Sequence, residues 1–564
     1  MKIKLLSLSI AFTLITATAF SQDTNQAVDS IALKNWYHQS YEKTGIYGVG
    51  TNDAINFLKS KGLKPSPIIV GVIDSGVQID HPDLKNNIWV NSKEIANNGK
   101  DDDGNGYTDD IHGWDFIGGK DGKDVDHDTM ESTRIVSLYE KLFGKDYFEV
   151  DDIHEKNRKK FPNEFKEYVR AVLVYEKELK EAKMSLSQID EQKEMIRQMT
   201  DILQKALGDK PMTIENINAA EFTIPQYKTA FLQMLENNSD LEGKNATQIK
   251  MLADSEMGEA VQYYSGKVDY MLNKNYDPRS IVGDNYADIK EKYYGNNEVE
   301  GPDALHGTHV SGIIAAERNN KIGMDGIAGD VAKILVVRAV PDGDERDKDI
   351  ANAIHYAVDN GAKIINMSFG KPFSPNKERV WEAMKYAEKK GVLMVHAAGN
   401  DNKNVDTEYN YPTNFKDNEN KSFVNNWITV GASTRYNNSL KASFSNYGKE
   451  KVDIFAPGLE IYSTITKGKY KFLQGTSMAS PVVAGCAALL WAYFPQLSAE
   501  QVKEILFITA NKSTTAVEAG GESDNSPAIT TTFDQLSSTG GVVDVYRAVK
   551  YAYDNFNPNK KSKK

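Results

Sequence analysis

Short apolar runs rich in β-branched residues recur along the chain and predict the strands of a buried sheet. They span residues 68–73, 334–337, 363–367, 392–395 and 427–430. Helical patterns lie between some of them, such as residues 349–360, which end before Gly361, a common stop for a helix. Strands that lack strict alternation and are separated by helices are typical of a parallel sheet covered on both faces. The sequence therefore predicts an α/β fold.

One long segment, from Glu131 to Asn297, interrupts this rhythm. It is highly charged, and its apolar residues recur at spacings of three and four in two stripes, within residues 165–179 and 196–207. Such stripes are typical of helices that pack on one another or on a host domain. We therefore expect residues 131–297 to form a helical insertion, and residues 68–130 and 298–550 to form the α/β domain around it.

The first 21 residues have the order of a secretory signal peptide. Two lysines precede an apolar run that ends in small residues, and cleavage is expected after Ala19 or Ser21. We therefore expect an exported protein, periplasmic or secreted, whose mature chain has no transmembrane segment. Residues 22–67 are expected to be an N-terminal extension or a short prosegment, and residues 551–564 a basic tail.

Composition narrows the possible functions. A chain of 564 residues with 40% hydrophobic content can bury a large core, and its net charge of −12 argues against nucleic-acid binding by phosphate neutralisation. The single cysteine, Cys486, has no partner for a disulfide within the chain, so we expect it to be a small buried residue. We expect no organic cofactor. The oligomeric state is left open.

Polar residues that can carry chemistry follow the apolar runs or begin helices. Asp74 ends the first predicted strand, at the sheet edge where α/β proteins place their sites. His306 and His309 lie three positions apart, on one face of a predicted helix. Ser477 stands where a turn enters an apolar helix, and Asn400 follows a strand and Ala-Ala-Gly.

These residue types suit acyl transfer. That reaction needs a hydroxyl, an imidazole to take its proton, a carboxylate to orient the imidazole, and donors for the developing oxyanion. The residues alone do not choose between His306 and His309, which are also candidate metal ligands. They do not exclude helix or turn capping by Asp74 or by a serine.

Together, the motifs resemble the subtilases, the subtilisin-like serine proteases. The likeness rests on Asp-Ser-Gly, His-Gly-Thr-His and Gly-Thr-Ser-Met-Ala-Ser-Pro in the chain order Asp, His, Ser, and on INMSFG, AAGN and IFAPG. It covers about residues 68–128 and 305–547. The resemblance implies a parallel-sheet, subtilisin-like fold and a serine endopeptidase that hydrolyses protein or peptide substrates through an acyl-enzyme intermediate.

The resemblance also assigns roles to residues. It makes Asp74 the orienting carboxylate, His306 the base, Ser477 the nucleophile and Asn400 the side-chain donor to the oxyanion. The segment that pairs with an extended substrate and lines the primary pocket comprises Ser368, Phe369 and Gly370, with Asn410 at the pocket floor, where the family often has a small residue. The alternative is a catalytically silent binding protein that uses the helical insertion as its interaction surface.

An acidic stretch, GKDDDGNGYTDD, has an order of oxygen ligands that suits calcium. The candidate ligands are Asp101, Asp103, Asn105, the carbonyl of Tyr107, and Asp109 or Asp110. A solvated acidic loop is the alternative, because the terminal glutamate of an EF-hand is missing. Asp83 and Asn320 are candidates for a second calcium site, because their segments resemble those that hold the family's structural calcium.

Overall fold

The structure, a computed structural model, describes residues 30–145, 151–419, 421–520 and 528–557. The predicted signal peptide and the last part of the predicted basic tail lie outside these residues. The chain divides into a helical unit, Ser132–Asn275, and a sheet-bearing unit formed by the described residues on either side of it. Residues 276–297, which we expected in the insertion, belong to the sheet-bearing unit.

A sheet of nine strands, counted over the described residues, forms the centre of the sheet-bearing unit. Its order is β10-β13-β7-β6-β5-β4-β1-β3-β2, and all neighbours are parallel except β10 and β13. The strands are β1 (Ile68–Asp74), β2 (Gly113–Asp115), β3 (Ala332–Arg338), β4 (Ile364–Met367), β5 (Leu393–Ala397), β6 (Trp427–Ser433), β7 (Ile454–Pro457), β10 (Asn511–Lys512) and β13 (Gly541–Val542). The predicted α/β fold is confirmed.

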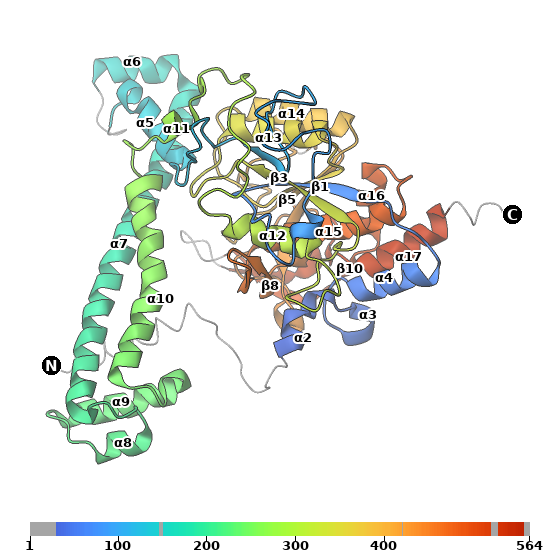
Figure 1. Cartoon of the computed structure of the whole chain (residues 1–564). Coiled ribbons are helices and arrows are strands. Elements are labelled where there is room, and N and C mark those ends of the chain that lie inside the picture. The colour runs from blue at the N-terminus through green and yellow to red at the C-terminus, as the bar shows by residue number, and fades with distance from the viewer. Residues whose placement is uncertain (1–29, 146–150, 420, 521–527, 558–564) are drawn as a thin grey trace. The chain divides into compact units, whose positions relative to one another are not determined.

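Helices cover both faces of the sheet (Figure 1). In β3, Ile334 and Val336 contribute to one apolar core, and the alternate residues Leu335 and Val337 contribute to the other. The first core contains α4 (Thr51–Ser60), α12 (Leu305–Ala315), α15 (Thr476–Tyr493), α16 (Ala499–Ile508) and α17 (Val545–Phe556). The second contains α13 (Asp347–Asp359) and α14 (Lys377–Lys389). Both faces are buried, which explains why the strands are apolar without alternation.

Among the described residues, α15 is the one helix long and apolar enough to cross a membrane by length and composition. It is 94% buried inside the protein, as a core helix of the sheet-bearing unit. Cys486 lies on this helix and is fully buried, as predicted.

Residues 30–67, the described part of the predicted N-terminal extension or short prosegment, pack into the sheet-bearing unit. Trp36 is buried, and its Nε1 donates to the carbonyl oxygen of Glu460 at 3.0 Å. The backbone N–H of Val545 donates to the carbonyl of Val49 at 2.9 Å, beside the packed helices α4 and α17. The segment therefore contributes to the core of this unit.

The helical unit has a core of its own. Its two longest helices, α7 (Pro162–Leu207) and α10 (Ala246–Gly266), lie side by side (Figure 1). Both predicted apolar stripes fall on α7, and Leu203, Phe231 and Ile249 are buried in the core of the unit. The remaining long helices are α5 (Glu131–Phe143), α6 (Asp152–Lys160) and α9 (Pro225–Asn237).

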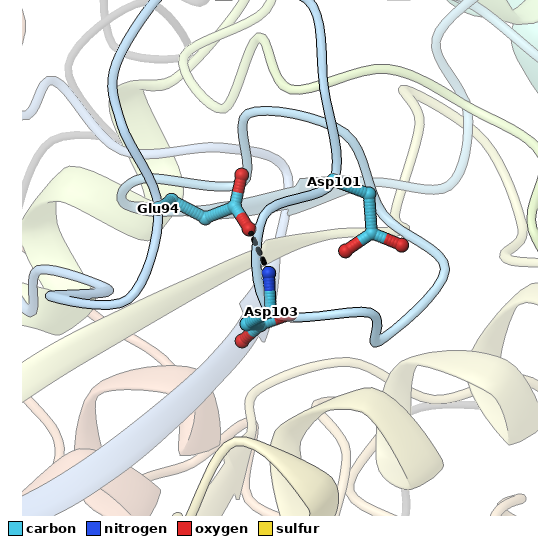
Figure 2. A group of neighbouring side chains, drawn as sticks. All are labelled: Glu94, Asp101 and Asp103. Atoms are coloured by element: carbon cyan, nitrogen blue, oxygen red, sulfur yellow. Dashed lines mark hydrogen bonds between the residues drawn. The ribbon is translucent and has the colours of Figure 1, made fainter.

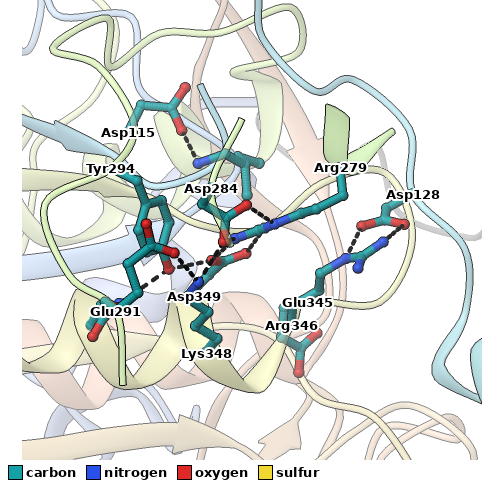
Figure 3. A network of polar contacts seen from close by, with 12 residues as sticks. Asp115, Asp128, Arg279, Asp284, Glu291, Tyr294, Glu345, Arg346, Lys348 and Asp349 are labelled. Carbon is teal, nitrogen blue, oxygen red and sulfur yellow. Dashed lines mark hydrogen bonds and ion pairs between the residues drawn. The ribbon is translucent and has the colours of Figure 1, made fainter. Parts of the chain in front are cut away.

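Buried ion pairs fasten the segment that follows the helical unit to α13 (Figure 3). Arg279 donates to both carboxylate oxygens of Asp349 and of Asp284, at 2.6 to 2.8 Å. Lys348 Nζ, which is fully buried, lies 2.5 Å from Asp284 Oδ2 and 2.8 Å from Glu291 Oε2. Because these charges are out of water, each depends on its partners.

We predict that Arg279→Met destabilises the sheet-bearing unit by about 3–5 kcal/mol, because it leaves the buried carboxylate of Asp349 without its arginine and Asp284 with Lys348 alone. Urea unfolding followed by tryptophan fluorescence measures this unit selectively, since all six tryptophans lie outside Ser132–Asn275. The measurement uses a Ser477→Ala background to prevent self-cleavage.

The control for this measurement is Lys43→Met, which removes the exposed ion pair with Asp53. It should leave the unfolding free energy unchanged, because exposed pairs contribute little. Equal effects of the two substitutions would contradict the importance of the buried network.

Candidate active site

A carboxylate and an imidazole are hydrogen-bonded at the carboxyl edge of the sheet. Asp74 ends β1, and His306 is the second residue of α12. Nδ1 of His306 lies 2.7 Å from Oδ1 of Asp74. Asp74 is 2% exposed, whereas the His306 side chain is 37% exposed. One ring nitrogen is thus held by a buried carboxylate, and the ring itself is accessible from solvent.

The two histidines of the His-Gly-Thr-His motif differ in their surroundings. Burial by itself lowers the pKa of His306, but the charge and hydrogen bond of Asp74, helped by Asp303, outweigh it and raise this pKa above its usual value. His309 is fully buried, and its Nε2 lies 3.1 Å from the carbonyl oxygens of Ile461 and Lys471. Burial lowers the pKa of His309 to about 3. His306 is therefore the histidine whose environment suits a base.

The predicted nucleophile lies in the first turn of α15, where backbone N–H groups have no partner within the helix. Ser477 Oγ donates to the carbonyl oxygen of Ser368 at 2.9 Å, and Ser368 Oγ donates to the carbonyl oxygen of Ser477 at 2.9 Å. Among the described residues, no hydrogen bond joins Ser477 to His306. Ser480 is fully buried and donates to Asn366 Oδ1 at 2.9 Å, so it has a structural partner.

The side chain of Asn400 is oriented by the residue that precedes the serine. Oδ1 of Asn400 accepts from the backbone N–H of Thr476 at 2.8 Å and from its hydroxyl at 3.0 Å. With Oδ1 held, Nδ2 is the end of the amide left to donate. This amide and the N–H of Ser477 are donors of the kind that stabilise an oxyanion. Thr476 was missed from the sequence, because its only signal was its place beside Ser477.

The residues expected to bind substrate lie at the ends of β4 and β5. Ser368, Phe369 and Gly370 follow β4 directly. A Cβ on Gly370 would lie 2.5 Å from Oδ1 of Asn410. Nδ2 of Asn410 donates to the carbonyl oxygen of Ala398 at 3.0 Å, just beyond β5. The Asn410 side chain thus fills space between the two strand ends.

Three carboxylates converge in the acidic loop: Glu94, Asp101 and Asp103 (Figure 2). Their ligand oxygens lie within 4.8 Å of one another. Glu94 Oε1 accepts from the backbone N–H groups of Asp102 and Asp103, and Asp101 accepts from those of Asn105 and Gly106. Converging carboxylate oxygens fit a calcium ion. Glu94 was missed from the sequence, because its only signal was an acidic residue seven positions before Asp101.

The other predicted ligands in this loop have different partners. Asn105 Oδ1 accepts from the backbone N–H of Tyr107, and its Nδ2 donates to Asp110 Oδ2 at 3.0 Å. The carboxylate of Asp109 accepts from the backbone N–H groups of residues 98 and 99. Asp110 also accepts from the Tyr356 hydroxyl at 2.6 Å. The structure therefore brings Asp101 and Asp103 together, and it commits the Asp109 and Asp110 carboxylates to other hydrogen bonds.

The second predicted calcium pair is in direct contact. Nδ2 of Asn320 donates to Oδ1 of Asp83 at 2.6 Å, and the backbone N–H of Met324 donates to Oδ2 at 3.1 Å. Asp83 is fully buried, and burial raises its pKa. The carboxylate is thus satisfied by hydrogen bonds in this arrangement.

Comparison with known proteins identifies relatives of this chain. The model of the subtilase family matches residues 66–526. A thermophilic serine proteinase of Bacillus sp. (strain AK1) is 40% identical over 235 residues, which are 41% of this chain and 52% of that protein. Thermitase of Thermoactinomyces vulgaris is 36% identical over 282 residues, which are 48% of this chain and 86% of that protein.

Two further proteins match this chain over different fractions of their own length. The cell wall-associated protease of Bacillus subtilis (strain 168) is 39% identical over 239 residues, which are 42% of this chain and 25% of that protein. The chain thus spans about half the length of the Bacillus sp. (strain AK1) proteinase and about a quarter of the length of the Bacillus subtilis protease. Among solved structures, a protease from Pseudoalteromonas arctica matches with 28% identity over 46% of this chain and 78% of that chain, at a TM-score of 0.36.

Proposed function

Because this chain belongs to the subtilase family, as its motifs predict, we propose that it is an exported serine endopeptidase with Asp74, His306 and Ser477 as its catalytic triad. The observation that best supports the proposal is the 2.7 Å contact between Asp74 and His306, at the same sheet edge as the catalytic motifs. Export is supported by the order of the first 21 residues and by the name of the cell wall-associated relative.

In the proposed mechanism, Asp74 holds His306 in the tautomer that carries its proton on Nδ1. Nε2 then takes the proton of Ser477 as Oγ attacks the peptide carbonyl carbon, and later delivers it to the leaving amine. Water hydrolyses the resulting acyl-enzyme by the same route. Ser477 must first exchange its hydrogen bond to Ser368 for one to Nε2, a rotation about its side-chain bond that substrate-free geometry often requires.

Substrate binding is proposed to use the segment after β4. An extended peptide pairs with Ser368, Phe369 and Gly370, and the side chain of its P1 residue, on the acyl side of the cleaved bond, points toward Gly370 and Asn410. Because the Asn410 side chain fills this space, the proposed pocket favours small P1 side chains.

We also propose a structural calcium ion held by Glu94, Asp101 and Asp103, with Asp83 and Asn320 as a second candidate site. The support for the first is the convergence of three carboxylates. The ion would offset their mutual repulsion and fix the loop.

The second candidate function is a catalytically silent binding protein that uses the helical unit. The hydrogen bond from Ser477 Oγ to Ser368 fits a substrate-free enzyme as well as a silent protein, so it does not distinguish them. Labelling of the serine separates the two candidates.

We predict that a fluorophosphonate labels Ser477 and that Ser477→Ala abolishes both labelling and casein hydrolysis. Loss of the nucleophile lowers turnover by about 10⁶-fold in enzymes of this mechanism. Ser480→Ala is the matched control and should keep labelling, because Ser480 bonds only to Asn366. Absence of labelling in the wild-type protein would favour the silent binding protein.

Asn400→Ala should lower kcat by about 10² to 10³-fold with little change in KM, because the oxyanion exists only along the reaction path. Asn400→Asp keeps the size of the side chain and removes its donor, so it should lose at least as much. Steady-state kinetics on a chromogenic peptide measures both variants. An unchanged kcat would remove Asn400 from the oxyanion hole.

Calcium should raise the melting temperature, because an ion that binds only the folded chain adds about 2.7 kcal/mol at a hundredfold excess over Kd. The combined change of Asp101→Asn and Asp103→Asn should diminish this shift, and Glu94→Gln should do the same. Differential scanning fluorimetry in calcium and in EDTA measures it.

The matched control is Asp102→Asn, because the Asp102 carboxylate binds the backbone of Ile95 and the side chain of Asn98, outside the group. It should keep the full calcium shift. A full shift in the double variant would make the loop a solvated acidic turn and would assign the remaining effect to Asp83 or elsewhere.

A further inference from the structure

A cavity of about 220 Å³ opens beside His306, in the sheet-bearing unit. Asp74, His306, Ser368 and Phe369 line it, whereas Gly370 and Asn410 do not. It is therefore distinct from the space that we assign to the P1 side chain. Its volume is several times the roughly 30 Å³ that a water molecule occupies in the liquid, so it has room for a side chain.

Three carboxylates line the cavity in addition to Asp74: Asp126, Asp303 and Asp342. Two of them are fixed through the backbone, because the N–H of Asp342 donates to the carbonyl of Asp126 at 2.9 Å. Asp303 Oδ1 accepts from the N–H of Leu305 at 3.0 Å, one residue before His306. The three carboxylates thus come from separate segments that meet beside the base.

The cationic side chains near these carboxylates do not balance them. Arg338 is the only arginine or lysine among the described residues that line the cavity. Its guanidinium is committed to Asp115 Oδ2 at 2.7 Å, to the Ser75 carbonyl at 2.9 Å and to the Val125 carbonyl. His127 lies beside the cavity, with Nδ1 2.8 Å from Asp342 Oδ2. One partly exposed imidazole faces a group of carboxylates.

Two polar atoms in the cavity wall also lack a hydrogen-bond donor within the described part of the chain. Asp74 Oδ2 and Ser75 Oγ are buried and have no hydrogen-bond partner among the described residues. Buried polar atoms in proteins normally have a partner. Burial raises the pKa of Asp342 and the charge and hydrogen bond of His127 lower it, but the charges of Asp126 and Asp303 add to the rise, so the pKa stays above its usual value. A cation placed among these carboxylates would lower it.

The spacing of the carboxylates distinguishes an organic cation from a metal ion. Among the described residues, only Glu94, Asp101 and Asp103 form a carboxylate group whose ligand atoms all lie within 4.8 Å of one another. Asp126, Asp303 and Asp342 do not converge in this way. A long side chain with a charged end suits such a dispersed arrangement better than a compact ion.

We propose that this cavity binds a lysine or arginine side chain of the substrate at P2, the residue that precedes P1. The inference rests on the proposed peptidase function. Successive side chains of an extended peptide point to opposite sides. A P1 side chain directed toward Gly370 and Asn410 therefore directs its P2 neighbour toward His306 and the carboxylates.

Two quenched fluorescent peptides that differ only at P2, lysine in one and norleucine in the other, test the proposal. We expect kcat/KM to be about five- to tenfold higher for the lysine peptide, as fits ion pairs open to solvent. The ratio should fall between about 0.1 M and about 1 M NaCl, because the screening length shortens from about 10 Å to about 3 Å.

Variants then identify the carboxylates responsible. The combined change of Asp303→Asn and Asp342→Asn should bring the lysine-to-norleucine ratio close to one. The ratio is the readout, because any effect on the pKa of His306 is common to both peptides. Asp80→Asn removes an exposed carboxylate outside the cavity and should keep the wild-type ratio. Asp342→Lys should favour a peptide with glutamate at P2.

Binding of the same peptides to the Ser477→Ala variant, followed by fluorescence anisotropy, separates this proposal from that of catalysis. Tighter binding of the lysine peptide supports the cavity even if the wild-type protein cleaves neither peptide, an outcome that would overturn the peptidase function alone. Equal binding and equal cleavage of the two peptides would overturn the cavity proposal and leave the peptidase function intact. A lysine preference that survives in the double variant would also overturn it.

Discussion

The structure depends on holding both ends of a long insertion to one sheet, and buried ion pairs do this. Asp128 and Glu131, which precede the helical unit, pair with Arg346 and Lys371 respectively, each at 2.7 Å. After it, Arg279 pairs with Asp349 at 2.6 Å (Figure 3). Arg346 immediately precedes α13 and Lys371 lies near it. Arg279 lies on the segment that follows the helical unit and reaches α13 from there. The segment that leads to His306 is therefore anchored where it begins, although 232 positions separate His306 from Asp74 in the sequence.

The site needs this rigidity because its groups come from distant elements. Asp74 belongs to a strand that is buried on both faces, whereas His306 and Ser477 each begin a helix that packs in the same core. Small shifts of either helix would separate the imidazole from the carboxylate or the amide of Asn400 from the serine. Thr476 joins two of these parts, since it orients Asn400 and precedes Ser477 on α15.

The sequence predicts the local features well and the long-range ones poorly. Residues 68–73 form a strand and Asp74 lies at its end, because burial on both faces leaves a continuous apolar run. The choice between His306 and His309 was beyond the sequence without the family resemblance, because it depends on contacts with Asp74 and with strands β8 (Ile461–Ile465) and β9 (Lys469–Leu473). Glu94 was missed for the same reason: a carboxylate joins a cluster through the fold and not through a motif.

The distribution of cations separates structural carboxylates from those open to a ligand. Asp115, Asp128 and Asp349 are buried, as is the side chain of Asp284, and each carboxylate is paired with an arginine within the chain. Asp126 and Asp342 lie only a few residues from these pairs but are about half exposed, and a histidine is their ion-pair partner. These four carboxylates are neutralised by arginines, whereas the carboxylates beside His306 have no arginine or lysine among the described residues as ion-pair partner. That contrast makes the charge more than a consequence of the overall acidity of the protein, because acidity alone would not concentrate it at the site of the base.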